Sequence, residues 1–97
     1  MESEIQSAIL AWLKEQNIYS EKMVLGNRSG LPDVRCCVCG VFVAFEVKVP
    51  GEKPKPLQAY NLRKIRESGG IGLSVTTLAE VKAVVAAITK KPELKCY

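Results

Sequence analysis

Apolar residues recur at helical spacing near the start of the chain. Ile5, Ile9 and Trp12 lie three or four positions apart, which predicts an amphipathic helix over about residues 2–17 with one stripe on a core. Farther along, β-branched runs alternate with turn-forming residues, a pattern typical of short strands separated by loops. The other predicted elements are, in chain order, a strand in "KMVLG" (22–26), a loop (26–32), strands at 34–38 and 41–49 joined by a turn at Cys39 and Gly40, a Pro-rich loop (50–56), a helix from Pro56 to about Ser68, a strand at 71–75 and a helix ending near Thr89.

This order of elements, α-β-β-β-α-β-α, predicts an α/β protein with a mixed central sheet flanked by helices. The stretch from the strand at 41–49 through the next helix to "IGLSV" has the length of a parallel βαβ unit. The sequence shows no internal repeat, and 97 residues with 47% apolar content fit a single domain over residues 1–97.

Three charged residues lie in and beside the apolar hairpin. Because strand side chains alternate, Glu46 and Lys48 are predicted on the same face as Phe42 and Ala44, while the neighbouring valines line the other face. Asp33 opens the preceding strand, and counting back from the hairpin turn brings it level with about residue 46. We therefore expect two carboxylates and one ammonium group to meet at one edge of an apolar sheet.

Two neighbouring carboxylates form an oxygen site suited to Mg²⁺ or Mn²⁺. Such an ion would offset the cost of burying the acids, polarise a phosphodiester and lower the pKa of a bound water. Lys48, at about 4 Å, would orient that water or stabilise the pentavalent oxyanion. The alternative is structural: Glu46 and Lys48 form a surface ion pair worth about 0–1 kcal/mol, and Asp33 merely follows a proline turn.

Composition narrows the chemistry further. The chain has no histidine, which excludes Ser-His and Cys-His nucleophile pairs and most transition-metal sites. Its net charge of +4 favours an acidic partner such as nucleic acid without requiring one. Three of the four cysteines crowd into "CCVC" on a predicted strand, and we expect all four to be small buried hydrophobes rather than zinc ligands or disulfide partners: Cys36, Cys37, Cys39 and Cys96.

The sequence carries no segment typical of a membrane protein. Neither end resembles the apolar region of a signal peptide, and no window of about 18 apolar residues could cross a bilayer. We therefore expect a cytoplasmic protein with no membrane partner.

The arrangement of "G-x-P-D", an apolar hairpin, "E-x-K" and a helix resembles the PD-(D/E)xK nuclease superfamily. The stretch from "GLPD" to "ESGG" is similar to its viral-type replication and repair branch, the VRR-Nuc domain, and the resemblance runs nearly end to end. It implies a restriction-endonuclease-like fold. It also implies Asp33 and Glu46 as metal ligands, together with Val47, and Lys48 as a catalytic residue. Gln58 matches a glutamine of the family, although it could equally be an ordinary polar residue in the first turn of a helix.

The family also has a glutamate at the start of its first helix, and this chain offers Glu2 and Glu4. At 100° per residue, Glu2 lies about 50° from the centre of the apolar stripe, whereas Glu4 lies more than about 100° away. We therefore favour Glu2 as the site residue. The alternative, an ordinary first-turn acid that complements the helix dipole, suits Glu4 well.

The resemblance implies a Mg²⁺-dependent endodeoxyribonuclease that acts on structured DNA in a bacterial or phage-infected host cell. Stand-alone members of this length resemble homodimeric Holliday-junction resolvases, whose two active sites face opposed strands of a four-way junction. The alternative is a non-catalytic module that binds branched DNA. Candidate phosphate contacts, for which solubilising charge is the alternative role, are Arg28, Lys53, Lys55, Arg63, Lys64 and Arg66.

Overall fold

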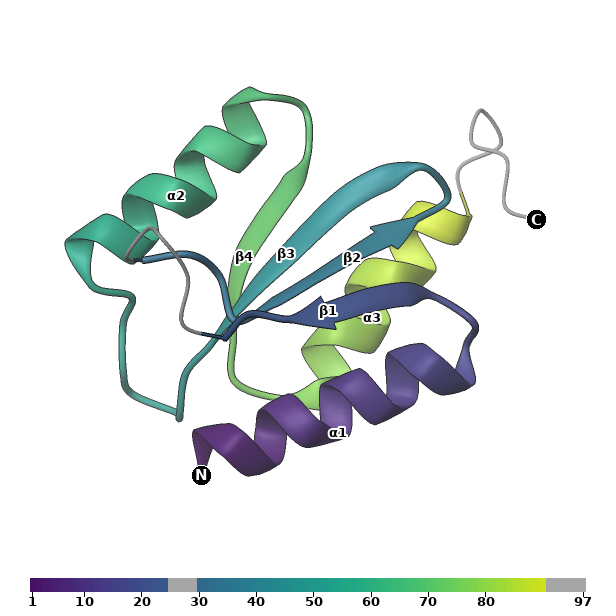
Figure 1. The fold of residues 1–97 in the computed structure, drawn as a ribbon, viewed down its shortest axis with the longest axis horizontal. Coiled ribbons are helices and arrows are strands. Elements are labelled where there is room, and N and C mark those ends of the chain that lie inside the picture. Colours follow the sequence, from purple (N-terminus) through teal and green to yellow (C-terminus); the bar gives the residue numbers. More distant parts are fainter. Residues whose placement is uncertain (25–29, 91–97) are drawn as a thin grey trace.

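The computed structural model describes residues 1–24 and 30–90 of the chain. Three helices and four strands follow one another in the predicted order (Figure 1). None of the helices in these residues is long and apolar enough to cross a membrane. The elements are α1 (Glu2–Glu15), β1 (Tyr19–Lys22), β2 (Val34–Val38), β3 (Val41–Val47), α2 (Pro56–Glu67), β4 (Ile71–Val75) and α3 (Leu78–Thr89).

The four strands form one mixed sheet in the order β1-β2-β3-β4. β1 pairs antiparallel with β2, and β2 pairs antiparallel with β3 through the turn at Cys39 and Gly40. β4 pairs parallel with β3, so β3, α2 and β4 form the predicted parallel βαβ unit. The predicted fold class is therefore confirmed, and β3 lies between an antiparallel and a parallel neighbour.

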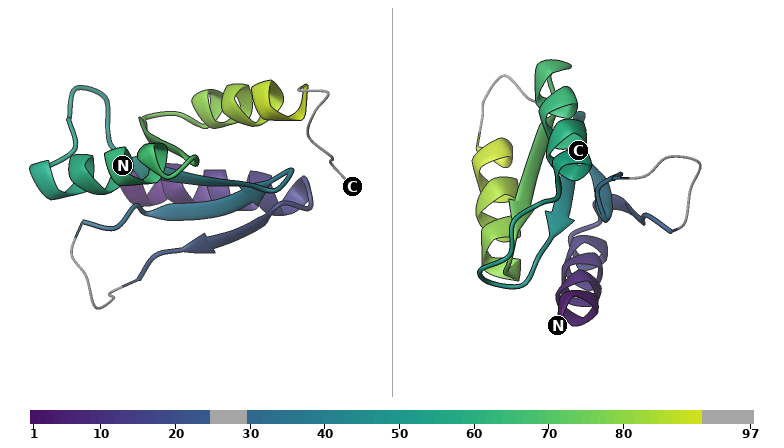
Figure 2. Two further views of the ribbon diagram at one scale, coloured as in Figure 1. Left: turned by 90° about the horizontal axis from the view of Figure 1, so that it is seen from above. Right: turned by 90° about the vertical axis from the view of Figure 1, so that its left-hand side faces the viewer.

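The sheet has two different faces. The inner face, which includes Val34, Val43, Phe45 and Val47, packs against α1 and α3 and forms one apolar cluster with them. The outer face carries the alternate residues of β3 and lies under α2, which is separated from α1 and α3 in Figure 1 and in the right-hand view of Figure 2. The alternation predicted for β3 is therefore correct, because its odd-numbered residues face the apolar core.

Helix α2 approaches the outer face closely because β4 has a glycine beneath it. A Cβ atom added at Gly72 would lie 2.7 Å from the carbonyl oxygen of Leu62, closer than side-chain atoms approach in folded proteins. The short approach buries Leu62 and Ala44 between helix and sheet. The first turn of α2, which begins at Pro56 as predicted, follows the loop that leaves β3.

The first strand lies earlier in the chain than predicted. β1 covers Tyr19–Lys22, not the apolar "KMVLG" at 22–26, of which residues 25 and 26 lie outside the described residues. The chain reverses at Asn17, whose φ of 59° ends the helical conformation, so pairing with β2 begins at Tyr19. Because β1 is held by backbone hydrogen bonds at a sheet edge, its side chains are mostly exposed and leave no apolar pattern in the sequence.

The cysteines differ from one another in a way that the sequence did not predict. Cys36 is buried in the core as expected, whereas Cys37 is exposed on the outer face. Cys39 has a φ of 50° in the hairpin turn and is disulfide-bonded, so the expectation of an unpaired buried residue is wrong at this position. Cys96 lies outside the described residues, and those that are described contain no cluster of three His, Cys, Asp or Glu side chains able to hold a metal.

Candidate active site

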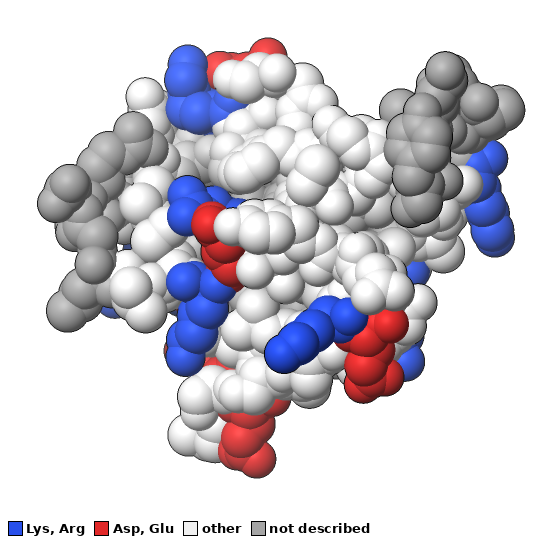
Figure 3. Space-filling view, turned by 45° about the vertical axis from the view of Figure 1, so that its right-hand side comes forward, with Lys and Arg blue, Asp and Glu red and all other residues white. Residues whose placement is uncertain are grey.

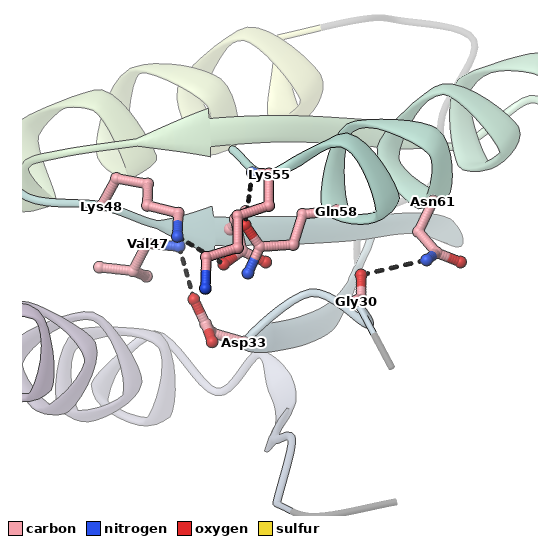
Figure 4. A network of polar contacts seen from close by, with 8 residues as sticks. Gly30, Asp33, Val47, Lys48, Lys55, Gln58 and Asn61 are labelled. Atoms are coloured by element: carbon pink, nitrogen blue, oxygen red, sulfur yellow. Dashed lines mark hydrogen bonds and ion pairs between the residues drawn. The ribbon is translucent and has the colours of Figure 1, made fainter. Parts of the chain in front are cut away.

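Asp33 and Glu46 meet at the end of the β2–β3 hairpin. The register pairs Val34 with Phe45, so the next residue outward on each strand brings Asp33 level with Glu46, as the sequence predicted. The main-chain amide of Val47 donates a hydrogen bond of 2.8 Å to Asp33 Oδ2. This bond fixes the Asp33 carboxylate across the end of β3, and it leaves Oδ1 free of that contact (Figure 4).

Glu46 is almost completely buried, with 2% of its surface exposed. Its Oε1 atom is buried and has no hydrogen-bond partner among the described residues. Burial raises the pKa of Glu46 to about 8, and the charge and hydrogen bonding of Asp33 contribute in the same direction. A buried carboxyl oxygen without a hydrogen-bond partner is costly for stability, so this position is better suited to binding a cation than to packing.

The third charged residue, Lys48, lies beside this pair. Its Nζ is 3.8 Å from Glu46 Oε2, and its side chain is only 10% exposed. The surface ion pair considered from the sequence is therefore wrong, because both partners are buried. The ammonium group lowers the pKa of Glu46, but burial and Asp33 outweigh it. The predicted carboxylate, carboxylate and ammonium trio thus occupies one site.

The start of α1 contributes a further carboxyl to this site. The pKa of Glu2 is raised, first by a hydrogen bond shared with Glu52, then by burial and the charges of Glu52 and Asp33, while Lys48 opposes the shift. Glu4 points elsewhere: its carboxylate is 3.6 Å from the amino terminus, and its side chain is 78% exposed. Of the two helix acids, the structure therefore brings Glu2, not Glu4, near the charged trio.

Glu52 was not identified from the sequence. It lies in the Pro-rich loop after β3, where the composition indicated only an exposed segment. Its contact with Glu2 depends on how that loop returns toward α1, which is a tertiary arrangement without a local signal.

Gln58 points from the first turn of α2 toward the same site (Figure 4). Its Oε1 accepts a hydrogen bond of 2.8 Å from the main-chain amide of Lys55, the residue that precedes the helix. The carbonyl end of the side chain therefore caps α2. Gln58 thus has the structural role considered from the sequence, and in Figure 4 its side chain extends from α2 toward that of Lys48.

Asn61 holds the segment that leads into Asp33, a role that the sequence did not suggest. Its buried amide nitrogen donates to the carbonyl oxygens of Gly30, at 3.1 Å, and Leu57, at 3.0 Å. Gly30 has a φ of +77°, and a Cβ there would lie 2.7 Å from Leu57 Cγ. The glycine of "GLPD" is therefore required by both its conformation and its contact with α2, and this contact fixes the approach to Asp33.

The candidate phosphate contacts differ in whether their side chains already have a partner in the protein. Lys53 and Lys55 are exposed, whereas Arg63 and Lys64 both pair with Glu67, at 3.7 Å and 3.2 Å. The other candidates are Arg66, which donates a 2.7 Å hydrogen bond to the carbonyl oxygen of Gly72, and Arg28, which lies outside the described residues. On the face shown in Figure 3, basic and acidic side chains are interspersed and do not form one continuous basic patch.

The donors at this site fit a small divalent cation. Asp33 and Glu46 supply hard oxygen ligands, and Mg²⁺ typically binds one or two carboxylates while it keeps several waters. The buried Oε1 atom of Glu46, which has no hydrogen-bond partner among the described residues, is an oxygen that such a cation would contact. Val47 fits this scheme only through its main chain, because its side chain is buried in the core and its amide is bonded to Asp33.

Solved structures of other proteins share this fold. One, described as "VRR_NUC domain", has a TM-score of 0.75 and is 24% identical, with the match covering 88% of this chain and 94% of that chain. Another, described as "VRR_NUC domain protein", has a TM-score of 0.76 and is 18% identical, covering 89% of this chain and 85% of that one. No protein-family model and no curated protein matches the sequence. The chain therefore has the fold of VRR-Nuc domains, as the sequence predicted.

Proposed function

We propose that this protein is a metal-dependent endonuclease of the VRR-Nuc family that hydrolyses phosphodiester bonds in DNA. The observation that carries the proposal is the buried Glu46 carboxyl, which has an unpartnered oxygen and lies beside Asp33 and Lys48. Most buried polar atoms in folded proteins have a hydrogen-bond partner, so a carboxyl oxygen without one favours a functional role over a purely structural ion pair. The fold that the chain shares with solved VRR_NUC structures also supports a nuclease function.

In this proposal Asp33 and Glu46 bind Mg²⁺ or Mn²⁺, with the main chain of Val47 as a further ligand. When bound, the ion supplies polarisation of the phosphodiester and a lowered pKa for the attacking water. Lys48 acts as the catalytic cation that stabilises negative charge on the phosphate oxygens or orients the water. The amide of Val47 and the pairing of β2 with β3 hold the two carboxylates in place, so little reorganisation is needed on binding.

Glu2 and Gln58 complete the site at its two sides. Glu2 approaches from α1, where its carboxyl interacts with Lys48 and Asp33, and we propose that it binds an additional water or cation when it is ionised. Gln58 approaches from α2. Its side-chain oxygen caps the helix by accepting from Lys55, so its amide nitrogen can donate to another group. We propose that this amide orients the phosphate or the attacking water.

We further propose that the substrate is branched DNA, in particular four-way junctions, and that the protein acts as a homodimer. The proposal of a DNA substrate is supported by the net charge of +4 and by the basic side chains on the loop and helix next to the site. Lys53, Lys55, Arg63 and Lys64 would contact phosphates, which position a nucleic acid without reading its sequence. Arg28 remains part of this set as a sequence-based prediction.

The test is cleavage of labelled four-way, flap, splayed and linear duplex DNA with Mg²⁺, with Mn²⁺ and with EDTA. The proposal expects cutting only with a divalent ion. Glu46→Gln and Lys48→Met should each lower the rate at least about a hundredfold, which is the scale expected when an electrostatic catalytic contact is lost. Glu15→Gln, an exposed acid at the far end of α1, is the matched control and should keep full activity.

The same variants separate this function from the alternative of a non-catalytic DNA-binding module. A binding module would bind branched DNA with strong salt dependence and would not cut it under any metal condition. Its affinity for branched DNA would be the same in Glu46→Gln as in the parent protein. Retained cutting in Glu46→Gln or Lys48→Met would show that the active site lies elsewhere. The molecular mass in solution, measured with and without DNA, tests the dimer.

A further inference from the structure

A groove lies on the outer face of the sheet, between α2 and the β2–β3 hairpin. It encloses about 420 Å³, and its lining runs from Pro32, the neighbour of Asp33, to Phe42 near the start of β3. Arg35 from β2 and Lys64 from α2 are its charged residues, and none of the described residues that line it is acidic. This outer groove therefore begins beside the candidate active site and has a positive lining.

Phe42 is the unusual residue of the outer groove. It is 46% exposed, whereas Val43 and Phe45 on the inner face of the same strand are completely buried. A second hollow, lined in part by Tyr19 and Cys37, lies against the same ring, so space is open on more than one side of it. An exposed aromatic ring in a groove that is also lined by cations is a usual arrangement for stacking an unpaired nucleic-acid base.

Arg35 keeps hydrogen-bonding capacity for a phosphate. Its Nη2 pairs with Glu21 Oε1 at 2.8 Å and its Nε is buried without a partner among the described residues, but 37% of the side chain is exposed and open to a ligand. Residue 35 lies opposite Ala44 in the hairpin, so Arg35 and Phe42 are diagonal neighbours on the outer face. A base stacked on Phe42 would therefore carry its phosphate near the guanidinium group.

We propose that the outer groove binds an unpaired nucleotide of the DNA strand that is cut, with the base on Phe42 and its phosphate near Arg35 and Lys64. This inference rests on the proposed nuclease function and adds a preference for DNA with unpaired bases at a branch. Phe42 lies four residues from Glu46 on one strand, about 13 Å at ~3.3 Å per residue. At about 3.4 Å per stacked nucleotide, that distance places the bound base within about four nucleotides of the cut.

A paired base could not use this site. In a duplex each base is already stacked between its neighbours, and the ring of Phe42 could reach its face only after unstacking, which is costly. The outer groove should therefore discriminate forked from fully paired DNA. The basic side chains elsewhere on α2 contact phosphates and should not make this distinction.

The experiment measures binding in EDTA and at fixed salt, so that no cutting occurs. The probes are a forked duplex with one single-stranded arm and a fully paired duplex of the same length. Phe42→Leu keeps an apolar side chain at this position and removes the aromatic face, and it should weaken binding to forked DNA about 5- to 100-fold. Binding to the paired duplex should change less than about twofold. Thermal unfolding of the variant confirms that it remains folded.

Tyr60→Leu is the matched control, because Tyr60 is also 46% exposed but lies on α2 outside the outer groove. An unchanged affinity of Phe42→Leu for forked DNA, or an equal loss for both DNAs, would overturn the proposal. A selective loss in Tyr60→Leu without one in Phe42→Leu would overturn it as well.

The phosphate contact has its own measurement. Arg35→Gln should reduce the slope of log Kd against log salt by roughly 0.7–0.9, the value for one phosphate contact. Glu21→Gln, which releases Arg35 from its ion pair, should leave or increase that slope. An unchanged slope in Arg35→Gln would remove Arg35 from the site.

These outcomes are distinct from failure of the nuclease function. Selective, Phe42-dependent binding without any metal-dependent cutting would support the outer groove and reject the nuclease. Metal-dependent cutting, together with unaltered binding of forked DNA in Phe42→Leu, would support the nuclease and reject the outer groove.

Discussion

Phe45 and Glu46 are adjacent on β3 and equally hidden from solvent, yet their burial has opposite consequences. Phe45 is 0% exposed on the inner face, where it packs in the apolar cluster with α1 and α3. Glu46 is 2% exposed on the outer face, where one of its oxygens has no partner in the described chain. Burial on the inner face stabilises the fold, whereas burial on the outer face costs free energy.

This difference explains how a small domain keeps a charged site. The hydrogen bonds of β3 to β2 and β4 fix its backbone, so Glu46 cannot leave the outer face to reach solvent. The stability comes from the inner face, and the outer face is available for chemistry. Variants that act on one face only should therefore separate stability from activity.

The largest effect should come from the inner face. Phe45→Ala removes a completely buried aromatic side chain and should lower the free energy of unfolding by about 3–5 kcal/mol. That is a large part of the total of about 5–15 kcal/mol typical of a domain, so the variant should be largely unfolded well below the melting temperature of the parent protein. Chemical denaturation followed by circular dichroism measures it. A loss below about 1 kcal/mol would mean that the two faces do not differ as described.

Burial on the outer face should lower stability, and a pH series on the parent protein can show this. In the metal-free protein the pKa of Glu46 is about 8, against 4.5 for the ordinary side chain, so between these values the folded state holds a proton that the unfolded state has lost. Stability must therefore fall as the pH rises through this window, by about 2–4 kcal/mol between pH 5 and pH 8. Denaturant midpoints in EDTA across this range test the prediction.

Glu46→Gln is the control for the pH series. It has nearly the same shape but no titrating proton, so its stability should be almost independent of pH in that window and should exceed that of the parent protein at pH 8. Added Mg²⁺ should raise the melting temperature of the parent protein at pH 8 but not that of Glu46→Gln. A parent protein whose metal-free stability rises from pH 5 to pH 8 would contradict the burial of a neutral Glu46 carboxyl.

The parts of the site and of the fold differ in how much the sequence could predict. Strand alternation and hairpin register are local rules, so the meeting of Asp33 and Glu46 followed from counting residues. Glu52 and Asn61 reach the site through loop and helix placement, which depends on long-range packing and leaves no periodic signal. The edge strand β1 was misplaced for a related reason, because backbone pairing alone holds it.

The attachment of the site to α2 can be tested at a glycine. Gly30→Ala should cost about 2–3 kcal/mol, because alanine at positive φ is strained by about 1–2 kcal/mol and its Cβ would also meet Leu57. Gly40→Ala is the matched control, since Gly40 has a similar φ of +81° but no atom within 4 Å of an added Cβ. If Gly30 holds Asp33 in place, Gly30→Ala should also weaken Mn²⁺ binding, measured by calorimetry, whereas Gly40→Ala should not. Equal effects of the two variants would remove the contact with α2 from the account of the site.

The smallest effect should come from the exposed surface of α2, where charge affects binding without affecting the fold. Glu67 pairs with Arg63 and Lys64, but all three side chains are more than half exposed, and such pairs contribute only about 0–1 kcal/mol. Glu67→Gln should therefore change the free energy of unfolding by less than about 0.5 kcal/mol. It should nevertheless tighten DNA binding about two- to fivefold, because it leaves both cations to the phosphates.

Glu15→Gln makes the same change in net charge on α1, away from the proposed DNA surface, and should have a smaller effect. Equal tightening by both variants in a salt titration would show that only the net charge of the protein matters, and that the basic side chains of α2 form no particular surface for DNA.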